Sequence, residues 1–155
     1  MKQKEKKARN RRTNEQIDKD VISELEKLVA EYGFGNVNLS ALMKAANIEA
    51  NVYRRYGSME NLYDRLAKQY DFWINDAIDV SSLNILGPKK FFAETFKTLY
   101  RSLSDNTVMQ KLLLYEMSVI NETTKRTAET RDIMNLNLIA FYDNLFRPAK
   151  INIKA

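Results

Sequence analysis

The sequence predicts an all-α protein, and three observations support this fold class. Only four of the 155 residues are Gly and two are Pro, which is too little turn chemistry for a many-stranded sheet. Helix-forming residues such as Leu, Ala, Lys, Glu, Met and Arg are plentiful. Apolar residues also recur at helical spacing along most of the chain. A chain of this length can bury one continuous core, or a small head packed on a larger body.

The first helix is expected to begin at Asn14. Gly33 is expected to end it by serving as a left-handed C-terminal cap. Its apolar face comprises Ile17, Val21, Leu25, Leu28, Val29 and Tyr32. Asn38 stands where an N-cap belongs, so a second, short helix is expected from there to about Asn47. Asn47 is suited to this end because Asn tolerates the left-handed backbone conformation.

A third short helix is expected from Glu49 or Ala50 to Tyr56, with Ile48 filling the angle between it and the preceding helix. Ser58 is then expected to cap a longer helix. The apolar face of that longer helix reads Leu62, Leu66, Tyr70, Trp73, Ile74 and Ala77.

The second half of the sequence predicts further helices. Pro88 fits the first turn of a helix that carries Phe91, Phe92, Phe96, Leu99, Tyr100 and Leu103. Thr107 begins another, whose apolar residues are Leu112, Leu113, Tyr115, Met117 and Ile120. The polar interval "NETTKRTAETRD" is expected to be a loop or a solvated helical turn. A last helix ends at Pro148 and carries Ile133, Leu136, Ile139, Ala140, Tyr142, Leu145 and Phe146.

The composition argues against several function classes. The sequence has no Cys, which excludes disulfides and thiolate zinc sites, and no His, the commonest general base and metal ligand. We therefore expect no enzymatic activity, no metal and no cofactor. No apolar run approaches the roughly 20 residues of a membrane helix, and the charged N-terminus has no apolar segment behind it. We accordingly expect no membrane partner and a cytoplasmic location.

Positive charge is concentrated at the N-terminus. Residues 1–13 are expected to form a basic, disordered arm. Its first twelve residues hold one Glu and seven basic residues, which are Lys2, Lys4, Lys6, Lys7, Arg9, Arg11 and Arg12. The formal charge of the whole chain is +5, so the rest of the protein is close to neutral. Such an arm suits phosphates, but it is equally typical of a solvated tail that keeps a protein soluble.

Residues 38–56 have the chemistry of a helix-turn-helix, in which one helix braces the DNA backbone and the next enters the major groove. The exposed start of the second helix is expected to read base edges through Glu49, Ala50 and Asn51. The other residues of the predicted interface, mainly for phosphate contacts, are Asn38, Ser40, Lys44, Tyr53, Arg54, Arg55 and Tyr56. One of the two tyrosines is expected to pack into the core, while the other offers its hydroxyl to a phosphate.

This segment resembles the DNA-binding domain of TetR-type transcriptional repressors over about residues 16–75. That family runs an apolar helix into Gly-Phe, then a capped "T-x-x-x-I-A-x-x-A-G-V" helix, then a recognition helix with aromatic residues, then "S-K-E-x-L". The positions that match this pattern are Gly33, Phe34, Asn38, Leu42, Ala46, Asn47, Ile48, Tyr53, Tyr56, Ser58, Glu60 and Leu62.

The resemblance implies an all-α homodimer that binds a palindromic operator in double-stranded DNA. Residues 14–58 would be the DNA-binding head, joined by a long helix to a ligand-binding and dimerisation body, residues 59–155. Binding of a small apolar inducer would release the operator. Its pocket is expected near Phe72, Trp73, Phe92, Phe96, Tyr100, Tyr115 and Met117, with polar groups such as Asn75, Glu116 and Asn121 to orient it.

The sequence departs from the family pattern in three places. "EANV", between Ile48 and Tyr53, is one residue shorter than usual, which predicts a shorter or rotated recognition helix. Met59 replaces the usual Lys of "S-K-E" and removes a phosphate contact. Family members usually continue beyond the position of Ala155 into two more helices, so we expect either another mode of dimerisation or a longer native chain.

A second hypothesis comes from another class of function. The chain would then be a helical interaction or scaffold protein whose basic arm binds acidic partners or an anionic surface. Discrete complexes with DNA fragments would favour the regulator over the scaffold.

Overall fold

The computed structural model describes residues 12–71 and 78–147, and all regular structure in these two ranges is helical, which confirms the predicted all-α class there. In chain order the α-helices are α1 (Asn14–Tyr32), α2 (Leu39–Ala45), α3 (Ala50–Tyr53), α4 (Met59–Ala67), α6 (Leu83–Leu86), α7 (Pro88–Asp105), α8 (Thr107–Ser118) and α9 (Glu122–Phe146). The 3-10 turns between them are η1 (Arg54–Tyr56), η2 (Lys68–Tyr70) and η3 (Val80–Ser82).

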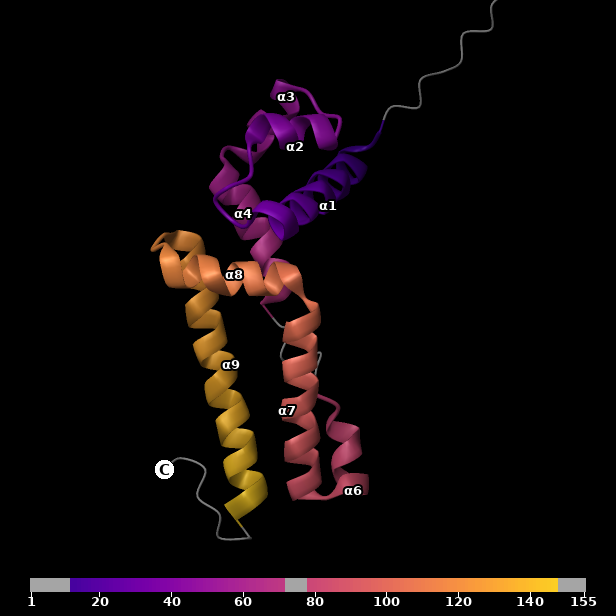
Figure 1. The fold of residues 1–155 in the computed structure, drawn as a ribbon, viewed down its shortest axis with the longest axis vertical. Helices are drawn as coiled ribbons and strands as arrows, with labels where there is room; N and C mark the ends of the chain where they lie inside the picture. Colours follow the sequence, from indigo (N-terminus) through magenta and orange to yellow (C-terminus); the bar gives the residue numbers. More distant parts are fainter. Residues whose placement is uncertain (1–11, 72–77, 148–155) are drawn as a thin grey trace, which may run out of the picture.

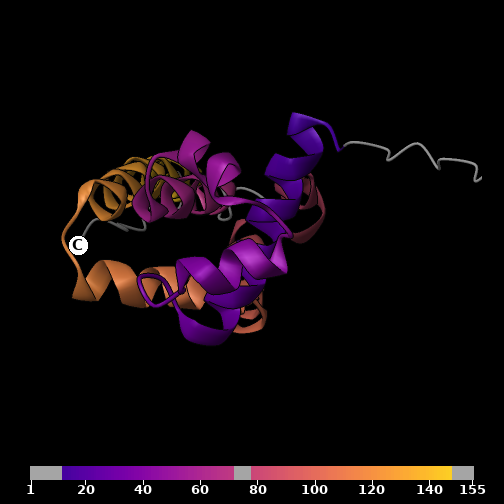
Figure 2. The ribbon, with the colours of Figure 1, turned by 90° about the horizontal axis from the view of Figure 1, so that it is seen from above.

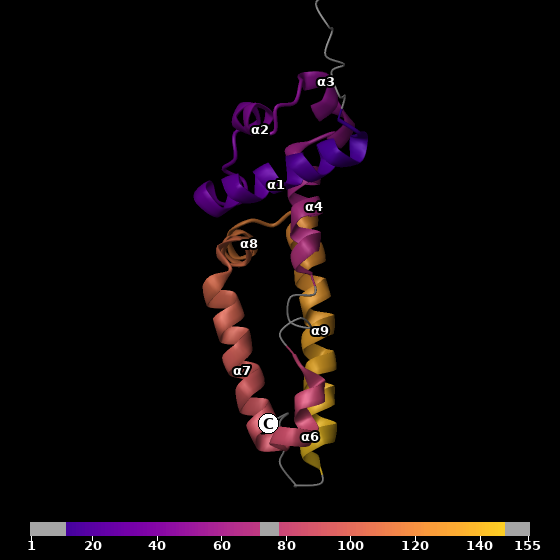
Figure 3. The same cartoon turned by 90° about the vertical axis from the view of Figure 1, so that its right-hand side faces the viewer.

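The helices form an elongated molecule with two distinct ends. α1, α2, α3 and α4 lie together at one end, and α8 crosses below them (Figure 1). α7 and α9 run antiparallel to the other end, where α6 lies beside the start of α7 (Figures 1 and 3). α1 is in contact with α8, and the two are seen from above in Figure 2. α2 and α3 are therefore the part of the fold farthest from α6.

Polar caps set where the N-terminal helices begin, as the sequence predicts. Asn38 Oδ1 accepts a hydrogen bond from the Ser40 amide at 2.8 Å and starts α2. Ser58 Oγ accepts one from the Asn61 amide at 3.2 Å and starts α4. Gly33 ends α1, but its φ of 88° combines with a ψ of 163°, so its backbone is not in the predicted left-handed helical conformation.

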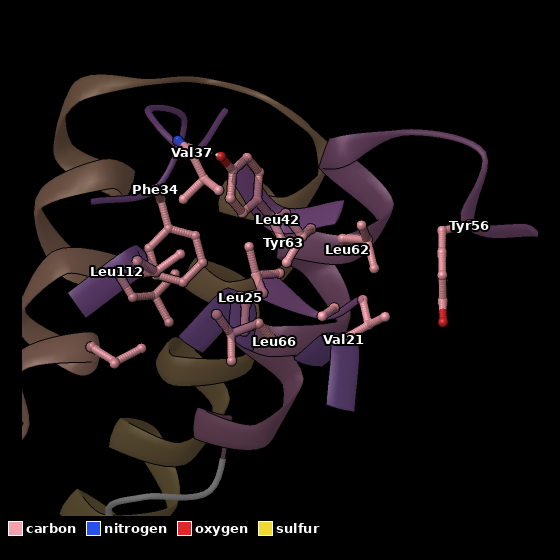
Figure 4. Close-up of a cluster of buried hydrophobic side chains, with 14 of the residues drawn as sticks. Val21, Leu25, Phe34, Val37, Leu42, Tyr56, Leu62, Tyr63, Leu66 and Leu112 are labelled. Atoms are coloured by element: carbon pink, nitrogen blue, oxygen red, sulfur yellow. Dashed lines mark hydrogen bonds between the residues drawn. The ribbon is translucent and has the colours of Figure 1, made fainter. Parts of the chain in front are cut away.

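One buried cluster joins α1 and α4 to α8. Val21 and Leu25 of α1, Leu62 and Leu66 of α4, and Leu112 of α8 are all essentially inaccessible to solvent (Figure 4). These apolar side chains follow the helical spacing seen in the sequence, so each helix contributes one face. Because α8 contributes to this cluster, the core of the N-terminal helices is completed by the second half of the chain.

Aromatic side chains hold the far ends of α7 and α9 together. Pro88 is the first residue of α7, as predicted, and the buried Phe91 follows one turn later. The ring centroid of Phe91 lies 6.1 Å from that of the buried Tyr142, and that of Phe92 lies 4.8 Å from the same ring. Phe146 completes this second cluster.

The helix that Ser58 caps is shorter than predicted within the described residues. α4 ends at Ala67 and continues as the 3-10 turn η2 to Tyr70. The Tyr70 hydroxyl donates a hydrogen bond to Glu26, which ties η2 to α1. The remaining predicted positions of this helix, Trp73, Ile74 and Ala77, lie outside the described residues.

The polar interval "NETTKRTAETRD" is not a loop or a solvated turn, because it forms the first part of α9, a helix of 25 residues. Asn121 and Thr124 form a reciprocal capping box that starts the helix. Thr123 and Thr127 are buried, and the Thr127 hydroxyl donates to the Thr123 carbonyl at 3.0 Å. Thr127 thus satisfies its hydroxyl inside the helix and can face the core.

Arg126 joins the start of α9 to α4 and η2. Its Nε donates to Asp64 Oδ1 and its Nη1 to Asp71 Oδ2, each at 2.6 Å. Arg131, five residues further along α9, forms an ion pair with Glu116 of α8. Charges that look solvated in the sequence are therefore partly buried and paired with residues far away in the chain.

Candidate nucleic-acid interface

α2 and α3 are joined by a turn whose backbone is fixed at two positions. Asn47 has a φ of 50°, the left-handed conformation that the sequence predicts for it. The Ile48 amide donates to the Met43 carbonyl at 3.0 Å, and the Ile48 side chain packs against the core. Ile48 thus fills the angle between the two helices, as predicted, and holds the start of α3 against α2.

Exposed side chains surround this turn on α2, α3 and η1. Ser40, Lys44, Glu49, Ala50 and Arg54 are all exposed. The side chains of Lys44, Glu49 and Arg54 form no hydrogen bond or ion pair with any other described residue. Glu49 occupies the N-cap position of α3, but its side chain forms no capping hydrogen bond there. These groups are therefore available to a partner outside the chain.

Arg55 and Tyr56, two other predicted contact residues, are bonded to side chains of α1. Arg55 Nη2 lies 2.7 Å from Asp18 Oδ1, and Arg55 Nη1 donates to Asn14 Oδ1, also at 2.7 Å. The Tyr56 hydroxyl donates to Asp18 Oδ1 at 2.5 Å. The Tyr56 side chain is only 4% exposed, so it belongs to the core and does not reach a partner outside the protein.

The environment of Tyr56 keeps its hydroxyl protonated. Burial raises the pKa of Tyr56 to about 12, and the hydrogen bond to Asp18 acts in the same direction. The guanidinium carbons of Arg65 and Arg55 lie 5.2 Å and 5.7 Å from the centroid of the ring. Arg55 and Arg65 thus both lie beside Asp18 and Tyr56, and these contacts fix η1 between α1 and α4.

Two of the remaining predicted contact residues, Tyr53 and Asn38, have roles within the fold. Tyr53 is half-buried and packs against the core, whereas Tyr56 is the tyrosine that is buried fully. The Asn38 side chain is engaged as the cap of α2. The side chain of Asn51 lies outside the described residues.

Arg12, at the end of the basic arm, is bound to the same turn. Its Nη1 pairs with Asp20 of α1 at 2.9 Å and donates to the Ala46 carbonyl at 3.0 Å. Its Nη2 donates to the Asn47 carbonyl. In the sequence Arg12 looks like one of several interchangeable arm charges, and its only distinguishing signal is its place directly before the helix cap Thr13.

The predicted inducer-pocket residues that the structure describes lie in different parts of the fold. Phe92 and Phe96 are in ring contact, with centroids 4.7 Å apart, at the α7–α9 cluster. Tyr115 belongs instead to the core under α1, where its ring stacks on Phe34 at 5.6 Å. Tyr100 and Met117 are largely exposed, at 74% and 86%. The two other predicted pocket residues, Phe72 and Trp73, lie outside the described residues.

The polar groups predicted for that pocket are used within the fold. Glu116 pairs with Arg131, and Asn121 caps α9 while its amide donates to the Tyr115 hydroxyl at 2.8 Å. The third such group, Asn75, lies outside the described residues. These contacts assign Glu116 and Asn121 to the packing of α8 against α9.

Comparison with known proteins identifies no relative. No family model matches the chain, and neither curated proteins nor solved structures include one that is similar to it. Across residues 12–71 and 78–147, no helix combines the length and the apolar character needed to cross a bilayer. The same residues contain no group of three acidic side chains arranged to hold a metal ion.

Proposed function

We propose that this protein is a ligand-responsive transcriptional regulator of the TetR type that binds DNA through α2 and α3. The observation that carries the proposal is the turn between these helices. It holds a short helix at one end of the molecule with Glu49, Ala50 and Arg54 exposed and without partners among the described residues. A helix-turn-helix requires such a protruding second helix.

The exposed residues divide into two roles in the proposed complex. Glu49 and Ala50 begin α3 and face base edges in the major groove, where a Glu carboxylate accepts from the amino group of cytosine. Lys44 and Arg54 flank them and contact phosphates, with Ser40 at the start of α2 as a further donor. Arg55 acts indirectly, because its bonds to Asp18 and Asn14 fix the turn that presents Arg54.

A second copy of the chain would complete the regulator. One side of α9 exposes Ile133, Leu136 and Ile139, at 62%, 65% and 44%. Their spacing places them along one side of the helix, and exposed apolar rows of this kind are typical of subunit interfaces. Two copies related by a twofold axis would present two α3 helices to half-sites about 34 to 36 Å apart in a palindromic operator.

Ligand control would act through the connection between α4 and α9. Arg126 ties α9 to Asp64 and Asp71, so a shift of α9 is transmitted to the helix that carries the DNA-binding end. A small apolar molecule that binds among the aromatic side chains of α7 and α9 would select one of two arrangements. It can act only through its difference in affinity for those arrangements.

The proposal is tested by selecting bound sequences from a random DNA pool and measuring affinity for the selected site. We expect an inverted repeat, since a twofold dimer reads the same half-site twice. Arg54→Ala should weaken binding by about 5- to 150-fold, the range for removing one interaction of about 1–3 kcal/mol with the DNA. Lys89→Ala is the matched control, because it removes an exposed positive charge from the first turn of α7, at the opposite end of the molecule.

Two results would contradict the proposal. If the selection enriches no DNA sequence, the result would favour the scaffold hypothesis, in which the basic arm binds acidic partners without reading DNA. Equal decreases in affinity from Arg54→Ala and Lys89→Ala would indicate charge attraction without a specific interface. Affinity should also fall steeply with salt, by about 10³- to 10⁵-fold between 50 and 200 mM for six to ten phosphate contacts.

A further inference from the structure

Asp18 of α1 holds two arginines that lie beside the proposed DNA-binding surface. Its Oδ1 atom lies 2.7 Å from Arg55 Nη2, and its Oδ2 atom lies 3.8 Å from Arg65 Nη1. The same carboxylate also accepts the hydrogen bond from the Tyr56 hydroxyl. One negative charge on α1 is therefore shared between a cation of η1 and a cation of α4.

The two arginines are not buried, so a partner outside the chain can reach them. The Arg55 side chain is 36% exposed and that of Arg65 is 50% exposed. Arg55 also lines a groove of about 440 Å³ beside α3, together with Val52 and with Glu49, which the proposed complex places at a base edge. A guanidinium at this place would meet DNA phosphates if no carboxylate held it.

The bond to Asp18 decides how these arginines act. A guanidinium on a phosphate raises affinity for any DNA sequence, because it releases counterions without reading a base. A guanidinium on Asp18 gives no such gain until DNA displaces the carboxylate, and the carboxylate itself repels the DNA backbone. Asp18 therefore lowers the binding that does not depend on sequence, while the exposed start of α3 keeps its access to the bases.

We propose that Asp18 is a specificity-determining residue that keeps Arg55 and Arg65 from binding DNA phosphates. This inference rests on the proposed function. It adds a residue that does not itself contact the operator but sets the ratio of specific to non-specific affinity. That ratio matters for a regulator because one operator competes with a large excess of other sequences.

Asp20 provides a matched control two residues further along α1. Its carboxylate pairs with Arg12 Nη1 at 2.9 Å, but the same guanidinium also donates to the carbonyls of Ala46 and Asn47. Asp20→Asn changes the net charge by the same amount as Asp18→Asn. It leaves Arg12 held by the two backbone carbonyls, so it releases no arginine to DNA.

Asp18→Asn leaves the two arginines with fewer contacts. Arg55 keeps one hydrogen bond, from Nη1 to the Asn14 side chain at 2.7 Å. Arg65 keeps its contact with the Tyr56 ring and has no other ion pair within the described residues. Both guanidiniums can then exchange a neutral amide for a phosphate, which is the stronger acceptor.

The experiment measures the affinity of full-length variants for the selected operator and for random-sequence DNA over a series of salt concentrations. On random DNA, Asp18→Asn should steepen the slope of log affinity against log salt by about 0.9 for each arginine that gains a phosphate. Affinity for random DNA should rise by about 2- to 5-fold for each released arginine, as for an exposed ion pair. Asp20→Asn should steepen the slope by clearly less.

The preference of Asp18→Asn for the operator over random DNA should fall. In the operator complex α3 is fixed in one register, so a released arginine gains a phosphate only where that register places one. On random DNA the protein is free to adopt any register that brings phosphates to the arginines. Asp18→Glu keeps the negative charge, so it should keep the salt slope and the preference of the unmodified protein.

A double substitution tests whether the two arginines cause the effect. Arg55→Ala with Arg65→Ala, added to Asp18→Asn, should remove the gain in slope on random DNA, because the released cations are absent. The same pair of substitutions in the presence of Asp18 should flatten the slope by less than about 0.9, since the arginines contact no phosphate there. This second measurement tests the inference even if Asp18→Asn does not fold, which thermal melting shows.

The outcomes distinguish this inference from the proposed function. If the unmodified protein selects no DNA sequence, the proposed function fails and this inference fails with it. If an operator is bound but Asp18→Asn and Asp20→Asn steepen the slope equally, only net charge matters and this inference alone is wrong. If Asp18→Asn weakens operator binding without steepening the slope on random DNA, Asp18 merely stabilises η1. An unchanged operator preference would show that Asp18 does not determine specificity.

Discussion

Two adjacent arginines in η1 have the same chemistry but different surroundings. Arg55 is bonded to Asp18 and Asn14 of α1, whereas Arg54 is exposed and has no partner among the described residues. The difference arises because α1 passes on one side of η1, so only one of two consecutive side chains can face it. The proposed DNA contact is therefore assigned to Arg54, and the fixing of the turn to Arg55.

This assignment predicts different effects of two similar substitutions on stability. Arg55→Ala should lower the free energy of unfolding by about 0.5–1 kcal/mol, because it removes a partly exposed ion pair and a hydrogen bond. Arg54→Ala should change it by less than about 0.5 kcal/mol, as is usual for an exposed residue without contacts. Urea denaturation followed by circular dichroism measures both. Equal decreases in stability would mean that Arg54 is also part of the folded framework.

Sequence reasoning at the residue scale can identify positions but not partners. The cap at Asn38, the left-handed Asn47 and the packing of Ile48 follow from local backbone chemistry, so they are predictable. Tyr56 and Arg55 look like DNA contacts in the sequence because their bonding partner, Asp18, lies 38 and 37 positions away. Nothing local indicates that α1 brings a carboxylate to them.

The same limit applies at the scale of elements and explains why the sequence does not predict the start of α9. Its polar residues lack the apolar periodicity that marks a helix facing a core. The capping pair Asn121 and Thr124 is a local signal, but the residues that accept Arg126 lie in α4 and just after η2, 62 and 55 positions away. A polar helix of this kind is stabilised by tertiary contacts that hydrophobic patterning does not detect.

The ion pair between Asp64 of α4 and Arg126 of α9 makes the free energy of unfolding depend on pH in the acid range. Burial raises the pKa of Asp64, but hydrogen bonds and attraction from Lys68 and Arg126 outweigh it, and the net pKa is lowered. A lowered carboxyl pKa in the folded state stabilises the fold above the ordinary Asp value near 3.8. That contribution disappears as the pH falls through the folded-state value, because the carboxyl group becomes protonated.

Asp64→Asn should therefore destabilise the protein at neutral pH, by about 1–2 kcal/mol for the removal of a charged hydrogen-bond partner. The difference from the unmodified protein should begin to shrink below about pH 4, where Asp64 becomes protonated in the unfolded chain, and should disappear as the pH falls through the lowered pKa of the folded state. Urea denaturation at a series of pH values checks this. Asp105→Asn, at the exposed end of α7, is the control. A difference that stays constant down to the lowest pH would show that the charge of Asp64 contributes nothing.

At the scale of the whole molecule, the DNA-binding end and the rest of the chain share one core. Met109 and Leu112 of α8 are buried among the side chains of α1 and α4, and Tyr115 stacks on Phe34 beyond the end of α1. The boundary drawn from the sequence after residue 58 therefore separates regions that pack together. A regulator built in this way would transmit changes in α8 directly to the helix on which α2 and α3 rest.

Leu112→Ala tests this shared core. Leu112 is 1% exposed, so the substitution should destabilise the protein by about 2–5 kcal/mol. Because the cluster is shared, amide hydrogen exchange should accelerate in α1 and α4 as well as in α8. Leu114→Ala is the matched control, since Leu114 lies on the same helix but is 58% exposed, and it should change stability by less than about 0.5 kcal/mol. If exchange accelerates in α8 while α1 and α4 keep their protection, the N-terminal helices fold independently. Within the described residues, coupling between the two ends would then have to pass through the contacts between α4 and α9, which include Arg126.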